Sequence, residues 1–194
     1  MIVAIAPFIA VAQNSAVQKP QVQRQQSQEQ APTPAGFLLS STDFMNGQAI
    51  PPRFTCDGAN ISPLLSWTAP PAGTQTYVLI MDDPDAPKHT WVHWLVYDIP
   101  ADASGLPDNL PSKPELETGA RQGANDFHEQ GYGGPCPPKG STHRYYFRLY
   151  AVDTRLGLLP GAMRADIERA MQGHVLAEVE LMGQYARVVK SGGQ

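Results

Sequence analysis

Two histidines, His93 and His143, stand near the starts of two segments that are rich in β-branched and aromatic residues. Imidazoles donate or accept hydrogen bonds and carry a proton near neutral pH, so a pair from separate strands could form a ligand site or a catalytic site. Alternation of side chains along a strand predicts two sets on common faces: Trp91, His93, Leu95 and Tyr97, and His143, Tyr145 and Phe147. Either histidine alone would more often be a core residue that bonds a backbone carbonyl. Two of them, both beside acidic loops rich in Gly and Pro, favour a site.

Asp83 opens the run Asp83-Pro84-Asp85-Ala86-Pro87, shortly before the first of these segments. A carboxylate beside an imidazole can fix its tautomer, raise its pKa, or accept a hydrogen bond from a ligand hydroxyl or ammonium group. Asp and Pro are also ordinary turn residues, so the run by itself indicates only a turn. Its combination with His93 and His143 favours a binding site.

Two classes of function fit these groups. In the first, the two imidazoles and the N–H groups of a loop rich in Gly and Pro bind a small anion, and phosphate affinity rises as the pH falls through about 6.5. In the second, a pocket histidine acts as the general base of a hydrolase and Asp83 orients it. No nucleophile is evident beside the histidines, because Ser141 and Thr142 lie in an ordinary turn. A non-catalytic binding protein is therefore favoured.

Several other functions are disfavoured. His89 and His93 have the spacing of a helical zinc site, but on a strand their side chains would lie about 13 Å apart. Signatures of serine hydrolases, of phosphate-binding loops and of zinc proteases are absent from the sequence, and we expect neither a metal nor a cofactor. A formal net charge of −4 without a basic cluster argues against nucleic acid. No apolar run in the body of the chain is long enough for stable membrane insertion.

The elements that must position these residues are mostly strands. Only 16% of the 194 residues are charged, and 19 Pro and 17 Gly indicate many turns and short strands rather than a helical bundle. Six segments are strand candidates: 37–40, 64–67, 76–81, 92–99, 144–152 and 175–185, the last of which could begin as a helix.

One helix and one long loop complete the expected domain. Residues 162–171 follow Pro160 and Gly161, precede the helix-ending Gly173, and place an apolar set on one face: Met163, Ile167, Ala170 and Met171. Residues 103–140 show little periodicity and are rich in Gly, Pro and Asn. A loop of that length in a compact domain is usually functional or covers something.

The amino-terminal segment differs from the rest. Residues 1–12 form a short apolar run that ends with the small residues Ala10 and Ala12, as in a secretory signal truncated before its basic region. Residues 13–35 are rich in Gln and Pro and are expected to be a disordered linker, so that the folded domain spans 36–194. This organisation predicts a periplasmic or secreted protein; the alternative is a cytoplasmic protein with a disordered apolar tail.

Four motifs in sequence order resemble the phosphatidylethanolamine-binding protein family, and within it the bacterial Raf-kinase-inhibitor-like branch of the YbhB/YbcL type. They are Phe54-Thr55-Cys56-Asp57-Gly58-Ala59-Asn60-Ile61-Ser62-Pro63; the Asp83–Pro87 run with Trp91-Val92-His93-Trp94-Leu95-Val96; Gly134-Pro135-Cys136-Pro137-Pro138-Lys139-Gly140 leading to His143-Arg144-Tyr145; and Gly173-His174-Val175-Leu176-Ala177-Glu178. The resemblance covers residues 37–187. It implies a mostly β, sandwich-like fold with a large central antiparallel sheet, a smaller sheet and a few short peripheral helices.

The resemblance also implies a small pocket at the strand ends that accepts phosphate, acetate, cacodylate or the phosphoryl headgroup of a phospholipid. It assigns eight residues to that pocket or its rim: Asp83, Asp85, Pro87, His93, Gly134, Pro137, His143 and Tyr145. The expected partner is a small anionic or phosphorylated ligand. Inhibition of a kinase or another protein is implied by the family's name alone. Two departures are an insertion of two residues before the Pro-Pro-Lys-Gly run of animal members and the lack of their long carboxy-terminal helix.

The two cysteines, Cys56 and Cys136, both fall in loops that the resemblance places near the pocket rim. An even number of cysteines in an exported protein fits one disulfide bond. Closing a loop of that size would stabilise the fold by about 4–5 kcal/mol in the chain-entropy model. The alternative is two free thiols in a reducing cytosol.

Overall fold

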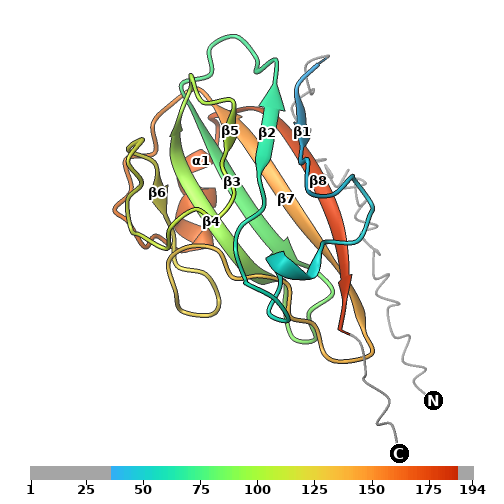
Figure 1. Ribbon diagram of the computed structural model, residues 1–194. Coiled ribbons are helices and arrows are strands. Elements are labelled where there is room, and N and C mark those ends of the chain that lie inside the picture. The colour runs from blue at the N-terminus through green and yellow to red at the C-terminus, as the bar shows by residue number, and fades with distance from the viewer. Residues whose placement is uncertain (1–35, 188–194) are drawn as a thin grey trace, which may run out of the picture. The chain divides into compact units, whose positions relative to one another are not determined.

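The computed structural model describes residues 36–187, and the predicted signal and linker segments (1–12 and 13–35) lie outside them. The described chain contains β1 (Leu38–Ser40), β2 (Leu65–Thr68), β3 (Thr76–Asp83), β4 (Trp91–Pro100), β5 (Gly105–Leu106), β6 (Arg121–Gln122), β7 (Thr142–Val152) and β8 (Val175–Ala186), with the 3-10 turn η1 (Pro52–Phe54) and the helix α1 (Arg164–Met171). One sheet has the order β6-β4-β3-β7-β8 and the other β1-β2-β5, and the paired strands are all antiparallel. The mostly β prediction is confirmed (Figure 1).

The six predicted strands are all present, and their ends differ from the prediction by at most two residues. The last of them, β8, is a strand from its first residue, so it does not begin as a helix. β5, β6 and η1 were missed because elements of two or three residues show no periodicity. Two of these, β5 and β6, lie in the long 103–140 segment.

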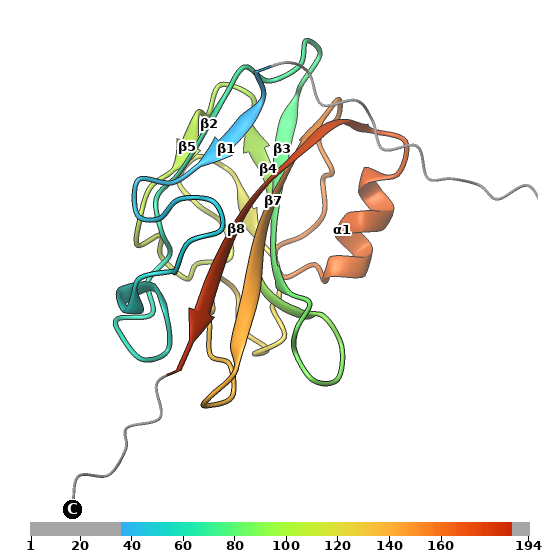
Figure 2. The same cartoon turned by 90° about the vertical axis from the view of Figure 1, so that its right-hand side faces the viewer.

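The large sheet is covered on both faces. On one face, alternate residues of β3 (Tyr77, Leu79 and Met81) pack in the core between the two sheets. On the other, Val78 and Ile80 pack against a second, smaller core that α1 closes. Figure 2 shows the three layers, with α1 and the small sheet on opposite sides of the large sheet. Because both faces of β3 are covered, every one of its side chains is buried.

A β-bulge in β4 changes one predicted face. Met81 on β3 pairs with Trp94 on β4, and the next residue, Asp82, pairs with Val92. His93 lies between Val92 and Trp94 and is therefore the extra residue of the bulge. Leu95 and Tyr97 pack in the core under α1, while His93 contacts Tyr145 on the other face. The prediction that Trp91, His93, Leu95 and Tyr97 share one face is therefore wrong, because a bulge interrupts the alternation.

The predicted face of α1 holds only in part. Ile167 and Met171 are buried, but Met163 is exposed because it lies at the N-cap, before the first helical turn. Gly173 has a φ of 79°, a left-handed conformation that ends the helix as predicted.

Asp82 anchors α1 to the large sheet. Its buried carboxylate accepts hydrogen bonds from Arg148 on β7 and from Arg164 on α1, the latter at 2.7 Å. Asp82 lies on the face of β3 that α1 covers, so its neighbour Asp83 points to the opposite face.

We expect Asp82→Asn to lower the free energy of unfolding by about 2–4 kcal/mol, somewhat less than for a fully buried pair, because both arginines remain partly exposed. Denaturant unfolding measures the change. Asp102→Asn, at an exposed turn, is the matched control and should change little. Equal effects of the two substitutions would contradict the anchoring role.

Candidate functional site

The ends of four neighbouring strands meet at one end of the large sheet, at the bottom in Figure 1. Since the strands are antiparallel, β3 and β8 end there while β4 and β7 begin there. A cavity of about 360 Å³ opens at this position. It is lined by Asp83, Ala86, Pro87, Trp91, His93, Phe127, Cys136, Pro137, Pro138, His143 and Arg187.

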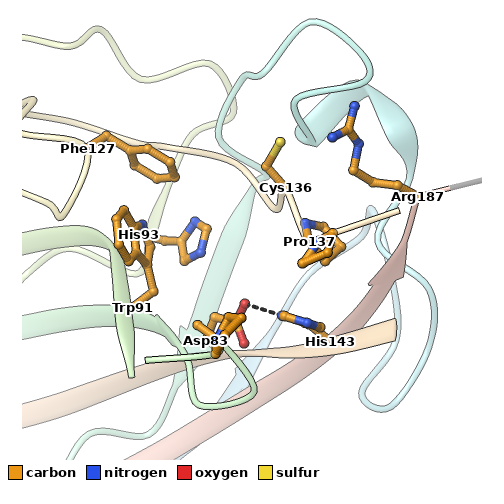
Figure 3. A pocket seen from close by; sticks show the side chains of 11 residues that line it. Asp83, Trp91, His93, Phe127, Cys136, Pro137, His143 and Arg187 are labelled. Carbon is orange, nitrogen blue, oxygen red and sulfur yellow. Dashed lines mark hydrogen bonds and ion pairs between the residues drawn. The ribbon is translucent and has the colours of Figure 1, made fainter. Parts of the chain in front are cut away.

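The centre of the cavity is a hydrogen bond between His143 and Asp83. The ring nitrogen Nδ1 of His143 lies 2.7 Å from Oδ2 of Asp83, and both side chains are more than nine-tenths buried. The other carboxylate oxygen, Oδ1, accepts the backbone N–H of Asp85 at 2.9 Å, which holds the 83–87 turn against the strand end. Figure 3 shows the pair at the floor of the cavity, with His93 on the far side of Asp83.

His93 is fixed by contacts on several sides. Its Nδ1 lies 2.6 Å from the carbonyl oxygen of Gly133, and its ring makes edge-on contacts with Phe127 and Tyr145. Burial lowers the pKa of His93, although the Gly133 carbonyl and the charge of Asp83 partly oppose this. The imidazole is therefore kept neutral near pH 7.

Two buried hydrogen-bond donors beside these groups have no protein partner. The hydroxyl of Tyr145 and the indole N–H of Trp91 make no hydrogen bond within residues 36–187. Burial and the charge of Asp83 both raise the pKa of Tyr145, so its hydroxyl keeps its proton. Neither atom is exposed to the cavity, and Tyr145 lies outside its lining, so these two donors belong to the wall behind the site.

The rim beside Pro137 is held by the 55–60 loop. A disulfide joins Cys56 to Cys136 across 80 residues, with the Cα atoms 5.4 Å apart. The N–H of Gly134 donates to Oδ1 of Asn60 at 2.8 Å, and a Cβ at this glycine would lie 2.4 Å from that oxygen. The rim therefore requires glycine at 134, and the expected disulfide is present.

Comparison with known proteins identifies the family. Residues 40–186 match the family model described as phosphatidylethanolamine-binding protein. This chain belongs to the phosphatidylethanolamine-binding protein family.

Its relatives in this family include a UPF0098 protein of Methanothermobacter thermautotrophicus, which is 51% identical over 149 residues, 77% of this chain and 98% of the relative. A UPF0098 protein of Aquifex aeolicus is 50% identical over 149 residues, 76% of this chain and 86% of the relative.

Two crystal structures share the fold. Escherichia coli YbcL, described as a member of the mammalian PEBP family, is 33% identical with a TM-score of 0.72, and the match covers 78% of this chain and 98% of YbcL. Chlamydia trachomatis CT736, described as a homologue of this family, is 38% identical with a TM-score of 0.72 over the same shares of the two chains. The resemblance seen in the sequence, including its YbcL-type branch, is confirmed.

Five of the eight residues that the family resemblance assigns to the pocket line the cavity: Asp83, Pro87, His93, Pro137 and His143. The other three, Asp85, Gly134 and Tyr145, lie outside the lining and support it. Tyr145 packs behind His93, Gly134 shapes the rim, and Asp85 holds the 83–87 turn.

Asp85 is neutralised by Arg144. Its carboxylate accepts hydrogen bonds from the Nε, the Nη2 and the backbone N–H of Arg144, at 2.6–2.9 Å. The guanidinium hydrogen bonds lower the pKa of Asp85 to about 2. The pair therefore adds little net charge to the rim.

Arg187 and Phe127 line the cavity but were not predicted. Arg187 follows β8 directly, and its guanidinium pairs with Asp57 at 3.0 Å, next to the disulfide. Phe127 lies in the long 103–140 segment, where Asn125 accepts its backbone N–H. No local pattern marks either residue, since each reaches the cavity through long-range packing.

The structure describes no metal centre in residues 36–187: no group of three or more His, Cys, Asp or Glu lies close enough to hold an ion. His89 lies in the turn before β4, with Nε2 3.5 Å from Asp126, and its ring contacts Trp91. Within the same residues, no helix is long and apolar enough to cross a membrane.

We expect Arg144→Ala to raise the pKa of the Asp85 carboxyl from about 2 toward its ordinary value of 3.8, because the guanidinium hydrogen bonds are lost. The depressed pKa means that this pair stabilises the fold above about pH 4 and loses that effect as the pH falls toward 2. A carboxyl NMR titration measures it. Arg169→Ala, which breaks the exposed pair with Asp166, is the control and should leave Asp85 unchanged. An unaltered Asp85 titration in Arg144→Ala would contradict the assignment.

Proposed function

We propose that this protein is a non-catalytic binding protein that holds a small phosphoryl anion, either phosphate or a phosphorylated headgroup, in the cavity of Asp83, His93 and His143. The observation that carries the proposal is the convergence of two imidazoles and the guanidinium of Arg187 on one cavity. A tetrahedral anion has enough oxygens to make hydrogen bonds with several such groups at once.

The charges around the cavity support an anion of low charge. Asp85 is paired with Arg144, and Asp57 is paired with Arg187, so neither carboxylate repels a ligand strongly. The carboxylate of Asp83 accepts a hydrogen bond from the ring of His143 and disfavours a multiply charged anion. Arg187 lines the cavity and adds a nearby positive charge.

The composition of the lining favours binding over hydrolysis. Among the described residues that line the cavity there is no Ser or Thr, and the one thiol, on Cys136, is bridged to Cys56. A hydrolase that used His143 as general base would have to activate water, because no side-chain nucleophile adjoins the ring.

We further propose that the protein works in an oxidising compartment, the periplasm or the cell exterior. The support is the disulfide, since such bonds persist outside the reducing cytosol. It joins the 55–60 loop to Cys136, which lines the cavity.

Isothermal titration of inorganic phosphate tests the binding function. We expect saturable binding that His143→Ala weakens at least roughly tenfold, since a hydrogen bond between the ligand and the imidazole is lost. His174→Ala is the matched control, because His174 forms a similar pair with Asp153 at 2.8 Å on the exposed surface, away from the cavity.

Two results would contradict the proposal. The first is the absence of phosphate binding by the oxidised, folded protein. The second is turnover of phosphate or carboxylic esters that His143→Ala abolishes and His174→Ala does not, which would favour the hydrolase.

A further inference from the structure

The hydrogen bonds of the two pocket histidines fix their tautomers. Nδ1 of His93 lies 2.6 Å from the Gly133 carbonyl oxygen, and a carbonyl oxygen can only accept, so this nitrogen carries a proton. Nδ1 of His143 lies 2.7 Å from a carboxylate oxygen of Asp83, which sets the same tautomer. Each ring, when it is neutral, therefore has its one N–H group directed at a partner in the protein.

The remaining nitrogen of each ring is left as an acceptor. Neither Nε2 has a hydrogen-bond partner in the chain from 36 to 187, and both rings line the cavity (Figure 3). A neutral imidazole with its proton on Nδ1 presents a lone pair at Nε2. Next to the carboxylate of Asp83, the cavity thus offers a cluster of acceptors, which an anion without protons cannot satisfy.

The charged groups that surround the two rings leave this arrangement in place. On the sheet face opposite the cavity, Asp82 is paired with Arg148 and Arg164. At the rim, Asp85 pairs with Arg144, Asp57 with Arg187, and Asp126 lies near His89. Among the described residues that line the cavity, Asp83 is the one carboxylate, and it has no Arg or Lys partner. Burial also lowers the pKa of His93, which opposes a proton on its Nε2.

We propose that the cavity selects tetrahedral anions that bring their own proton: phosphate and phosphomonoesters in the monoprotonated form, in preference to phosphodiesters and sulfate. The P–OH group donates to a bare imidazole Nε2, and the other oxygens accept from the guanidinium of Arg187, which lines the cavity. This inference rests on the proposed anion-binding function and names the class of ligand within it.

Intact phospholipids and free phosphorylated headgroups differ in this respect. The phosphate of an intact phospholipid is a diester, which has no P–OH group and cannot supply this donor. A free phosphorylated headgroup or another phosphomonoester can. The cavity should therefore prefer the monoester over the corresponding diester.

Titration of the full oxidised chain with four simple ligands tests the selectivity: inorganic phosphate, methyl phosphate, dimethyl phosphate and sulfate. We expect dimethyl phosphate and sulfate to bind at least roughly tenfold more weakly than methyl phosphate and phosphate, because the donor is lost. Above the second pKa of a monoester, about 6, binding of methyl phosphate should take up close to one proton, as titrations in buffers of different ionisation enthalpy will show.

The possible failures are distinguishable. If none of the four ligands binds, the proposed function fails. If sulfate and dimethyl phosphate bind as tightly as phosphate and methyl phosphate, the function stands and the selectivity is overturned, because protonated imidazoles would then supply the donors.

Asp83→Asn tests the tautomer directly. An asparagine amide can donate to Nδ1 of His143, which moves the ring proton to Nε2 and turns that acceptor into a donor. We expect dimethyl phosphate to gain at least roughly tenfold in affinity relative to methyl phosphate, compared at a pH where both carry one negative charge. Asp153→Asn, beside His174, is the control and should leave the ratio unchanged. An unchanged ratio in folded Asp83→Asn would contradict the proposed tautomer of His143. If this variant does not fold, the titrations of the unmodified protein with the four ligands still test the selectivity.

Discussion

The hydrogen bond between Asp83 and His143 is the constraint on which the rest of the site depends. It joins the end of β3 to the start of β7, and both side chains are more than nine-tenths buried. Such a bond is strong, and either partner alone would be a costly buried polar group. Its chemical consequence is equally important, since it decides which nitrogen of His143 faces the ligand.

The adjacent residues Asp82 and Asp83 show how one strand serves both stability and the site. Because successive side chains of a strand point to opposite faces, Asp82 holds α1 through Arg148 and Arg164, while Asp83 faces the cavity. On β4, the bulge at His93 changes the face of the sheet on which a side chain lies. It directs this imidazole to the same side of the sheet as Asp83, away from the core under α1.

Much of this arrangement could be predicted from the sequence, and the limits have physical causes. The long strands show clear periodicity and turn residues at their ends, so their positions were correct within two residues. The ordered motifs and the two cysteines placed Asp83, His93, His143 and the rim in one region. The bulge could not be foreseen, because register is set by pairing with β3 and not by β4 alone. Arg187 and Phe127 reach the cavity through contacts between distant segments, which leave no local pattern.

The central claim is that both pocket imidazoles carry their neutral proton on Nδ1 and present a bare Nε2 to the ligand. Nitrogen-15 NMR of the histidine rings in the ligand-free, oxidised protein at pH 7.5 tests it most directly. The account predicts that His93 and His143 both show a protonated Nδ1 and an unprotonated Nε2. A protonated Nε2 on either ring at this pH would contradict it.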